Sequence, residues 1–369
     1  MTLPALADLP TTTKASDPRQ ALVFQSQRIR GVCVLAIILI HVTPSFHYGT
    51  PFGWVTALQL YMNSLARFGV PCFVLLSGFF LSLNARNERP LPFYRRTVRF
   101  LLVPYVVYSA GYVVFAHRQF TGIIEVWLWA MLTGTAFYHL WFIPVIVQLY
   151  LLHPFLRTWY RRTGQGGGLV VTALVIQTVW AVATPDLAAQ AMNTDTWLTP
   201  AAVSLSFLSY IGYFVAGYYL NDHAADVDQV IRRRGLVIVA ALGWVTAAAV
   251  MTTGRAIALS GGPALGTISH QALAPLLSPA AFVVLAAWRS QGLLTRPIER
   301  LVQRSGMYAY GMYYLHPLVL EMVSWGWKHS VALPRSHGLF YVVAFPLVSV
   351  FTLFAVKLVA RLPFARYLT

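Results

Sequence analysis

The sequence is built from apolar runs that are long enough to cross a lipid bilayer. A helix needs about 17–25 such residues to cross ~30 Å of hydrocarbon. Runs of this length predict ten membrane-spanning helices, at residues 29–46, 65–83, 98–116, 140–156, 169–185, 201–220, 235–252, 270–288, 306–325 and 338–360. Charged residues are only 10% of the chain, whereas a soluble domain carries about 25%. We therefore expect an all-α polytopic membrane protein rather than a soluble, disordered or coiled-coil chain.

The lysines and arginines between these runs predict how the chain is oriented. With both termini in the cytoplasm and residues 121–136 not crossing, 21 of the 27 basic residues lie on the cytoplasmic side. Five lie outside, Arg67 and Arg255 among them, and Lys357 lies within the last span. Cytoplasmic loops of membrane proteins are enriched in lysine and arginine. A full crossing by 121–136 would invert every later loop, so we predict a short re-entrant or interfacial segment there.

The same pattern predicts one membrane domain with two short tails. Residues 1–27 are mixed and polar, without the apolar core of a cleavable signal peptide. The first apolar run is therefore expected to act as an uncleaved anchor. We expect a cytoplasmic tail at 1–27, a single membrane domain at 28–361 and a short cytoplasmic tail at 362–369.

The composition argues against several kinds of partner and cofactor. The net charge of +16 comes from short basic clusters between apolar runs, not from a soluble basic face, so we expect no nucleic-acid partner. The two cysteines, Cys33 and Cys72, both lie inside apolar runs, which excludes a disulfide framework and a cysteine metal site. No histidine pair has the spacing of a metal motif, so we predict no metal.

The first apolar run contains two ionisable residues, Arg30 and His41, eleven positions apart. On a helix this spacing is three turns plus ~20°, or ~16 Å along the axis, so both side chains share one face. Ionisable groups at bilayer depth are costly and usually have a task or a partner. The spacing alone is equally compatible with a functional pair and with a charge anchor plus a core histidine that is hydrogen-bonded to a neighbouring helix.

A second basic cluster, Arg95, Arg96 and Arg99, precedes the third span. Arg96 and Arg99 are about one helical turn apart, and guanidinium groups bind phosphate well. The alternative is orientation by positive charge alone, which explains most such clusters.

Five further residues are accessory candidates: Ser77, Glu125, His139, Trp141 and His316. Ser77 precedes a glycine, and this pair favours close helix packing over a nucleophile. Glu125 lies in the short 121–136 segment. His139 and Trp141 belong to an aromatic run that is typical of the membrane interface.

Taken in chain order, these segments resemble the acyltransferase-3 family of membrane acyltransferases. The matching features are the Arg30–His41 spacing, FVLLSGFFLS from Phe73, RRTVR from Arg95, YHLWFIPVIVQLYLLHP from Tyr138, and YGMYYLHPLV from Tyr310. The resemblance covers about residues 22–360. We expect no additional periplasmic domain of the kind that some members carry.

The resemblance implies transfer of an acyl group, usually acetyl from acetyl-CoA, to a hydroxyl of an envelope or exported glycan. It matches Arg30 and His41 to the family's essential pair, and Arg96 and Arg99 to its cytoplasmic arginine motif. The expected partners are an acyl-CoA, a glycan or lipid-linked oligosaccharide acceptor and the bilayer of a bacterial inner membrane. Acyl-CoA would be the donor substrate, with no permanently bound cofactor. Succinyl or longer acyl groups stay open.

We hypothesise that the three arginines of the second cluster hold the CoA phosphates while the thioester reaches His41. His41 would act as general base on the sugar hydroxyl or relay the acyl group itself. Arg30 would orient the donor or balance charge as the thiolate leaves. Tryptophans within 121–142 would stack on the acceptor sugar.

Three alternatives remain. A glycan or lipid-linked sugar transporter would have a similar number of spans, but would show paired halves that we do not find. A catalytically silent component of a polysaccharide-secretion complex would tolerate loss of His41. The other large family of membrane-bound O-acyltransferases would pair a late histidine with an asparagine, and His316 has no evident partner of that kind in the sequence.

Overall fold

The structure is a computed structural model that describes residues 18–43, 53–84, 90–116, 122–164, 166–193, 206–259, 277–287, 295–331, 333 and 337–362. Every regular element in those ranges is a helix, which confirms the all-helical expectation for that part of the chain. Parts of the predicted spans 29–46, 201–220 and 270–288, and most of both predicted tails, lie outside the described residues.

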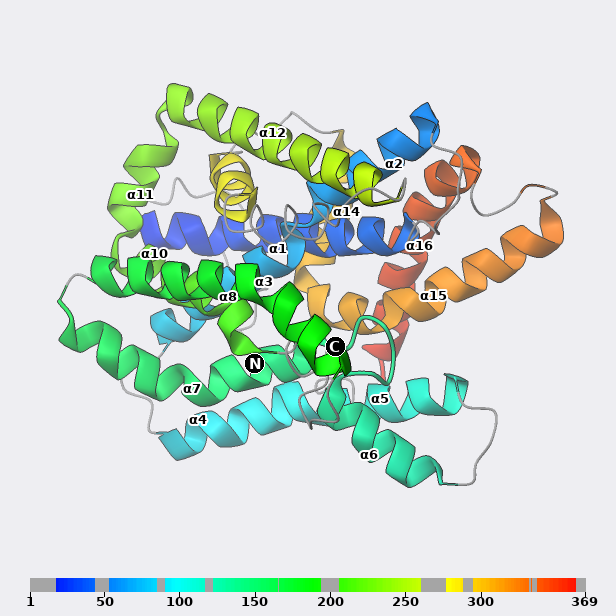
Figure 1. The fold of residues 1–369 in the computed structure, drawn as a ribbon, viewed down its shortest axis with the longest axis horizontal. Coiled ribbons are helices and arrows are strands. Elements are labelled where there is room, and N and C mark those ends of the chain that lie inside the picture. Colours follow the sequence, from blue (N-terminus) through cyan, green and yellow to red (C-terminus); the bar gives the residue numbers. More distant parts are fainter. Residues whose placement is uncertain are drawn as a thin grey trace. The chain divides into compact units, whose positions relative to one another are not determined.

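The helices are labelled in Figure 1. Their bounds are α1 (Pro18–Val42), α2 (Trp54–Ala66), α3 (Gly69–Asn84), α4 (Pro90–Thr97), η2 (Val98–Leu102), α5 (Val103–Ala116), α6 (Ile123–Thr133), α7 (Phe142–Arg162), α8 (Gly167–Asn193), η3 (Phe207–Ser209), α10 (Ile211–Asp222), α11 (Ala224–Ile231), α12 (Arg234–Leu259), α14 (Arg296–Met307), α15 (Ala309–Ser330) and α16 (Gly338–Val359). A further apolar helix spans Leu277–Ala287.

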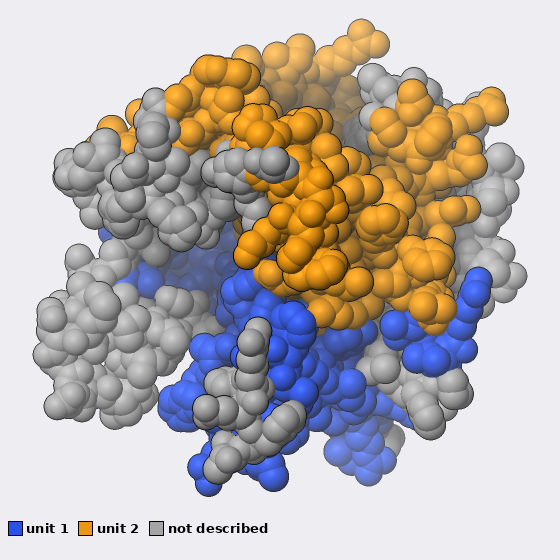
Figure 2. Space-filling model, turned by 90° about the vertical axis from the view of Figure 1, so that its right-hand side faces the viewer, with its two compact units in different colours: residues 1–15, 77–222, 359–369 blue, residues 16–76, 223–358 orange. Residues whose placement is uncertain are grey.

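The chain forms two compact units, which Figure 2 colours separately. Unit 1 comprises residues 1–15, 77–222 and 359–369, and unit 2 comprises residues 16–76 and 223–358. The division of the chain falls inside α3.

Six segments of the described chain are long and apolar enough to cross a membrane. They are Gln25–Val42, Trp54–Leu83, Pro90–Ala116, Gly167–Thr184, Arg234–Ile257 and Gly338–Val359. Apolar side chains also cover the outer faces of long helices: on α12, Ile238, Val239, Leu242 and Val245 are all exposed. A helix that exposes such a row in a folded protein is suited to lipid rather than water. The chain is therefore a multi-pass membrane protein.

The predicted span at 65–83 differs in detail from the structure, because α2 ends at Ala66 and α3 begins at Gly69. The cause is Pro71, in the first turn of α3. A helix continuing through this point would need an N–H from residue 71 to the Arg67 carbonyl, and proline has none. The chain therefore turns at Arg67 and Phe68, between α2 and α3.

The short apolar segment at 121–136 contains α6, which has eleven residues. At about 1.5 Å per residue it is ~16 Å long, about half of what a crossing requires. A glycine in the left-handed region of backbone conformation flanks α6 at each end: Gly122 at φ 69° and Gly134 at φ 68°. Trp127 donates from Nε1 to Ser109 Oγ at 3.1 Å, which ties α6 to α5 within unit 1.

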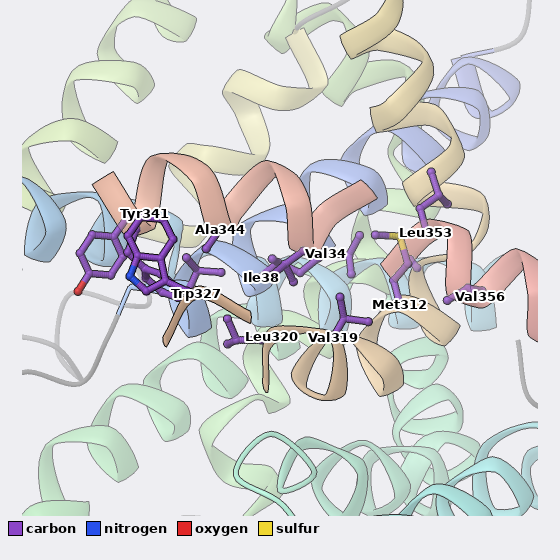
Figure 3. Packing of buried hydrophobic residues seen from close by; sticks show 14 residues of the cluster. Val34, Ile38, Met312, Val319, Leu320, Trp327, Tyr341, Ala344, Leu353 and Val356 are labelled. Atoms are coloured by element: carbon purple, nitrogen blue, oxygen red, sulfur yellow. The ribbon is translucent and has the colours of Figure 1, made fainter. Parts of the chain in front are cut away.

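The core of unit 2 is formed by α1, α15 and α16 (Figure 3). Val34, Ile38 and Val42 follow one another at helical spacing on α1 and are nearly inaccessible. They pack with buried residues of α15 and α16: Met312, Val319, Leu320, Trp327, Phe340, Ala344, Val348 and Val356. Residues at i, i+4 and i+8 share one helix face, so this core fixes which faces of α1 and α15 meet.

The helices α1 and α14 approach each other through two glycines. A Cβ on Gly31 would lie 1.9 Å from the Val302 carbonyl oxygen, and one on Gly306 would lie 1.8 Å from the Gln27 carbonyl oxygen. Small residues let helix backbones approach this closely. Beside the glycines, Arg28 Nη2 donates to Glu299 Oε1 at 2.5 Å. The contact anchors the helix that carries Arg30 and His41.

We expect Gly306→Ala to lower the unfolding free energy by about 1–3 kcal/mol, because the new methyl group overlaps backbone atoms that have no room to move. The measurement is thermal denaturation of the detergent-purified protein. Gly326→Ala is the matched control, since its Cβ would meet nothing within 4 Å. Alanine is the better helix former, so the control should be neutral or slightly stabilising. Equal melting temperatures for both variants would contradict this prediction.

Candidate functional site

His41 and His316 lie together in unit 2, one on α1 and one on α15. Their ring centroids are 5.2 Å apart and the ring planes are tilted by 31°. His41 follows Ile38 by three residues, and His316 lies between Met312 and Leu320 at helical spacing, so both extend the faces that form the core. His316 is fully buried, while His41 is partly exposed. The core packing of α1 on α15 thus produces a histidine pair.

The hydrogen bonds of His316 fix the position of its proton. Nδ1 lies 2.8 Å from the Tyr313 carbonyl oxygen and 3.1 Å from the Met312 carbonyl oxygen. A carbonyl oxygen can only accept, so Nδ1 carries the hydrogen and donates it. The lone pair of the neutral ring is then on Nε2. A hydrogen bond from one ring nitrogen fixes the tautomer of a histidine and leaves the other nitrogen as an acceptor.

A polar network lies beside the pair, centred on Asn63 of α2, which is 3% exposed. Its Nδ2 donates to the Ile40 carbonyl oxygen at 3.0 Å and to Thr43 Oγ1 at 2.9 Å. Its Oδ1 accepts from Arg67 Nη2 at 3.1 Å and from Arg255 Nη1 at 2.8 Å. The positive charge of Arg67 acts on His41. Two arginines therefore converge on one amide next to the histidine pair.

Arg30 is on the same helix as His41 but away from it. Because α1 is continuous from Pro18 to Val42, eleven residues separate the two side chains by ~16 Å along the axis. Arg30 is partly buried, and its charge acts on Cys33, whose thiol contacts that of Cys72. The pairing of Arg30 with His41 that the family resemblance implies stays a prediction.

The second arginine cluster lies in unit 1, where α4 passes into α5. Arg95 and Arg96 are in the last turn of α4, and Arg99 is in η2, a stretch of π-helix. Pro104 follows directly and has no N–H to give to the Phe100 carbonyl, which favours a wider turn at this point. Such π-turns recur at functional sites. Arg95 and Arg99 are exposed, whereas Arg96 is partly buried.

The charge of Arg96 acts on a buried histidine of α7, His153, which is not among the predicted site residues. The positive charges of Arg96 and Arg157 both act on His153, which is 3% exposed. His153 Nδ1 lies 2.6 Å from the Tyr218 hydroxyl oxygen, and its ring lies 5.1 Å from that of Phe93. Two cations, an imidazole and aromatic rings thus gather on one side of unit 1.

Three of the accessory candidates, Ser77, His139 and Glu125, lie in unit 1 and differ in how far they are buried. Ser77 is partly buried, and a Cβ on the following Gly78 would lie 2.0 Å from the Phe214 carbonyl oxygen, so this pair lies where α3 packs closely on α10. His139 is 1% exposed and lies edge-on to Tyr112 at 5.2 Å. Glu125 is in the first turn of α6 and is exposed.

Trp141 is the N-cap residue of α7 and lies at the end of the aromatic run. Its ring is 6.1 Å from that of Tyr210, and Gly134 admits its backbone, since a Cβ there would lie 2.7 Å from the Trp141 Cα. The run is thus folded back against the end of α6.

The candidate residues are divided between the two units. Unit 2 contains Arg30, His41 and His316, and unit 1 contains Ser77, Arg95, Arg96, Arg99, Glu125, His139 and Trp141. In the described ranges, no three histidine, cysteine or acidic side chains group as metal ligands would.

Sequence reasoning missed four polar residues that the fold gathers: Asn63, Arg67, His153 and Arg255. In the sequence, Arg67 and Arg255 were considered only as loop charges. His153 was considered only as part of the motif that begins at Tyr138. A single signal was available, a polar residue inside or at the end of an apolar run. Which of these residues meet each other depends on helix packing.

A family model described as an acyltransferase domain, that of acyltransferase family 3, matches residues 27–361. A protein of Staphylococcus aureus (strain MRSA252), named "Probable poly-beta-1,6-N-acetyl-D-glucosamine export protein", is 23% identical over 320 residues, covering 82% of this chain and 83% of that protein. A protein of the same name from strain MSSA476 is 23% identical over 312 residues. No solved structure matches. The family match confirms the resemblance drawn from the motifs.

Proposed function

Because the chain belongs to the acyltransferase-3 family, we propose that it is a membrane O-acyltransferase that moves an acetyl group from cytosolic acetyl-CoA to a sugar hydroxyl of an exported or envelope polysaccharide. The observation that carries the proposal is the pairing of His41 with His316 in unit 2, with ring centroids 5.2 Å apart. One of the two imidazoles is held as a single tautomer by backbone carbonyls. Such an arrangement suits the removal of a proton from a hydroxyl group.

In the proposed reaction His41 takes the proton of the acceptor hydroxyl. The hydroxyl oxygen attacks the thioester carbonyl carbon, the C–O bond forms and the C–S bond breaks. The thiolate of CoA leaves with the electron pair of that bond and receives the proton from His41. The rings of His41 and His316 are adjacent, with centroids 5.2 Å apart; an N–H of His41 directed to Nε2 of His316 in the working enzyme would aim the other ring nitrogen of His41 at the substrate. Transient transfer of the acetyl group to His41 is the alternative route.

We assign the donor phosphates to the basic cluster of unit 1. Arg96 and Arg157 act together on His153, and Arg95 and Arg99 lie exposed on the same turn of chain. Guanidinium groups bind phosphate oxygens in a bidentate manner. The loop charges support a cytoplasmic position for this cluster, where acetyl-CoA is available.

The topology we propose has ten spans, with both termini in the cytoplasm of a bacterium and α6 re-entrant or interfacial. The relatives from Staphylococcus aureus carry names that refer to a polysaccharide, which supports a glycan acceptor. Trp127, Trp129 and Trp141, in and after α6, would offer sugar-stacking surfaces on the outer side.

The test uses inverted membrane vesicles that contain the protein and are supplied with acetyl-labelled acetyl-CoA at the cytoplasmic face. The proposal expects release of free CoA thiol and entry of label into an alkali-labile ester on glycan or lipid. Vesicles that lack the protein are the control. Folded protein that incorporates no label from acetyl-CoA, succinyl-CoA or longer acyl-CoA would overturn the proposal.

A second candidate function is export of a glycan, which the names of the relatives favour. It predicts movement of glycan across the vesicle membrane without consumption of acyl-CoA. The same vesicles separate the two functions, because only acyl transfer releases CoA thiol.

Removing a donor-site arginine should weaken acetyl-CoA binding without abolishing chemistry. We expect Arg96→Ala and Arg157→Ala each to raise KM for acetyl-CoA about 10–100-fold with little change in kcat, because hydrogen bonds to charged groups contribute about 1.5–3 kcal/mol. Arg161→Ala is the charge-matched control, since Arg161 is exposed on the same helix as Arg157. A fall in kcat at unchanged KM would contradict the assignment.

A further inference from the structure

Three arginines lie along one face of α14 in unit 2. Arg296, Arg300 and Arg304 follow one another at intervals of four residues, so they share a helix face over about 12 Å. All three are exposed. The opposite face, which contains Val302 and Gly306, is buried against α1. The helix is therefore amphipathic, and we call its three exposed arginines the arginine stripe.

The positive charge of the arginine stripe is not cancelled by the helix that carries it. The one acidic residue of α14, Glu299, accepts hydrogen bonds from Arg28 of α1 and from Gln303. Arg300 Nε donates to the Arg296 carbonyl oxygen at 3.2 Å, which uses one of its five N–H donors. Among the described residues, no ion pair joins the stripe to an acidic side chain. The stripe thus presents its charge at the surface.

The connection of α14 to α15 relates the stripe to the membrane. Tyr308 alone separates the two helices, and α15 contains most of the predicted span at 306–325. Met307, three residues after Arg304, lies on the same face as the stripe and is 49% exposed. A helix with a basic face and exposed apolar residues at the end of a span is suited to the membrane–water interface. In the proposed topology this interface is the cytoplasmic one.

The chemistry of that interface matches the stripe. The cytoplasmic leaflet carries anionic phospholipids, which attract basic segments beside a span. Guanidinium groups bind phosphate oxygens in a bidentate manner. Successive arginines of the stripe are about 6 Å apart along the helix axis, so two of them can bind one phosphate or two neighbouring headgroups. The donor phosphates are assigned to other arginines, in unit 1.

We infer that the arginine stripe of α14 binds the headgroups of anionic phospholipids in the cytoplasmic leaflet and thereby stabilises α1. The two helices pack closely through Gly31 and Gly306, and α1 carries Arg30 and His41. A ligand that binds only the folded protein stabilises it by mass action. This inference goes beyond the proposed reaction, because its partner is a bilayer lipid rather than the acyl donor or the acceptor.

The test measures lipid binding and needs no turnover. Detergent-purified protein is titrated with phosphatidylglycerol or with phosphatidylcholine of the same acyl chains, and the bound lipid is measured by native mass spectrometry. We expect phosphatidylglycerol to bind at least about tenfold more tightly, because each arginine near an anionic lipid surface contributes on the order of a fivefold gain in affinity. Phosphatidylglycerol should also raise the melting temperature more than phosphatidylcholine does.

Substitutions then assign the binding to α14. The double variant Arg300→Gln, Arg304→Gln should bind phosphatidylglycerol about 10–30-fold more weakly and leave phosphatidylcholine unchanged. It should also lose the rise in melting temperature. The charge-matched control is Arg233→Gln, Arg234→Gln, which removes two exposed arginines of the same unit and should behave as wild type. Arg300→Lys, Arg304→Lys retains the charge and should keep most of the binding, which guards against a folding defect.

Several outcomes would overturn the inference. Equal binding of the two lipids would show that the headgroup charge is not recognised. Equal losses in the two glutamine double variants would indicate surface charge in general rather than α14. Displacement of bound phosphatidylglycerol by an equal concentration of CoA or of inorganic phosphate would assign the stripe to a soluble phosphate. Neither lipid measurement uses acyl transfer, so failure of the acyltransferase proposal and failure of this inference give different results.

Discussion

Replacement of His41 by alanine is expected to lower kcat/KM for acetyl transfer about 10³-fold, because the group that takes the hydroxyl proton is removed. His41 is the partly exposed member of the pair, so it is the one that can meet substrate. The measurement is release of CoA thiol from acetyl-CoA in the presence of acceptor. Addition of free imidazole should restore part of the rate of the alanine variant, since a small base can occupy the vacated space.

His329→Ala is the control for this substitution, because His329 is an exposed histidine of unit 2 at the end of α15. It should retain full activity. Equal rates for wild type and His41→Ala would remove His41 from the chemistry and favour the export function. The two routes for His41 also separate here: an acetyl-imidazole intermediate predicts labelled protein after an acid quench without acceptor, whereas a general base predicts none.

Replacement of His316 by alanine is expected to cost about 10²-fold in kcat/KM, somewhat less than loss of His41. His316 is fully buried and is held by the Tyr313 carbonyl at 2.8 Å, so it acts on substrate through His41 as a positioning residue. In a pair that works as a unit, removal of the second member adds little once the first is gone. The double variant His41→Ala, His316→Ala should therefore be about as active as His41→Ala alone.

A purely structural role for His316 makes a different prediction. The cavity left by His316→Ala would then lower the thermal stability. The loss of activity caused by His316→Ala would multiply with the loss caused by His41→Ala in the double variant. Comparing the four proteins in one thermodynamic cycle decides between the two roles. His316→Gln retains a side-chain amide that donates to the Tyr313 carbonyl, so it should restore stability but not the full rate. Full additivity in the cycle would refute the positioning role.

The sequence predicted well that this chain is helical and that it spans a membrane, because both properties depend on the length and spacing of apolar runs. Apolar runs at 98–116, 169–185, 235–252 and 338–360 coincide with segments long and apolar enough to span the membrane. The break between α2 and α3 at Arg67 was missed, although its cause, Pro71, is visible in the sequence. The number of spans stays a prediction from the apolar runs, and their orientation stays a prediction from the loop charges.

The site was less predictable than the fold. His41 was found because an ionisable residue near the end of an apolar run is conspicuous, and the family resemblance gave it a role. The sequence offered no partner for His316, since the two histidines are 275 residues apart. Asn63 was missed because a polar residue in a short helix is ordinary, and nothing in the neighbouring sequence distinguishes it from other such residues.

What the sequence by itself determined is the all-helical, membrane-spanning class and the family, since apolar length, loop charge and motif order are properties of the linear chain. What only the tertiary structure decided is which polar residues meet. The pairing of His41 with His316 follows from the packing of Val34 and Ile38 of α1 against α15 and α16. The convergence of Arg67 and Arg255 on Asn63 follows in the same way from the packing of α2 on α1 and α12. Contacts between distant segments depend on side-chain shape at helix interfaces, which no local pattern encodes.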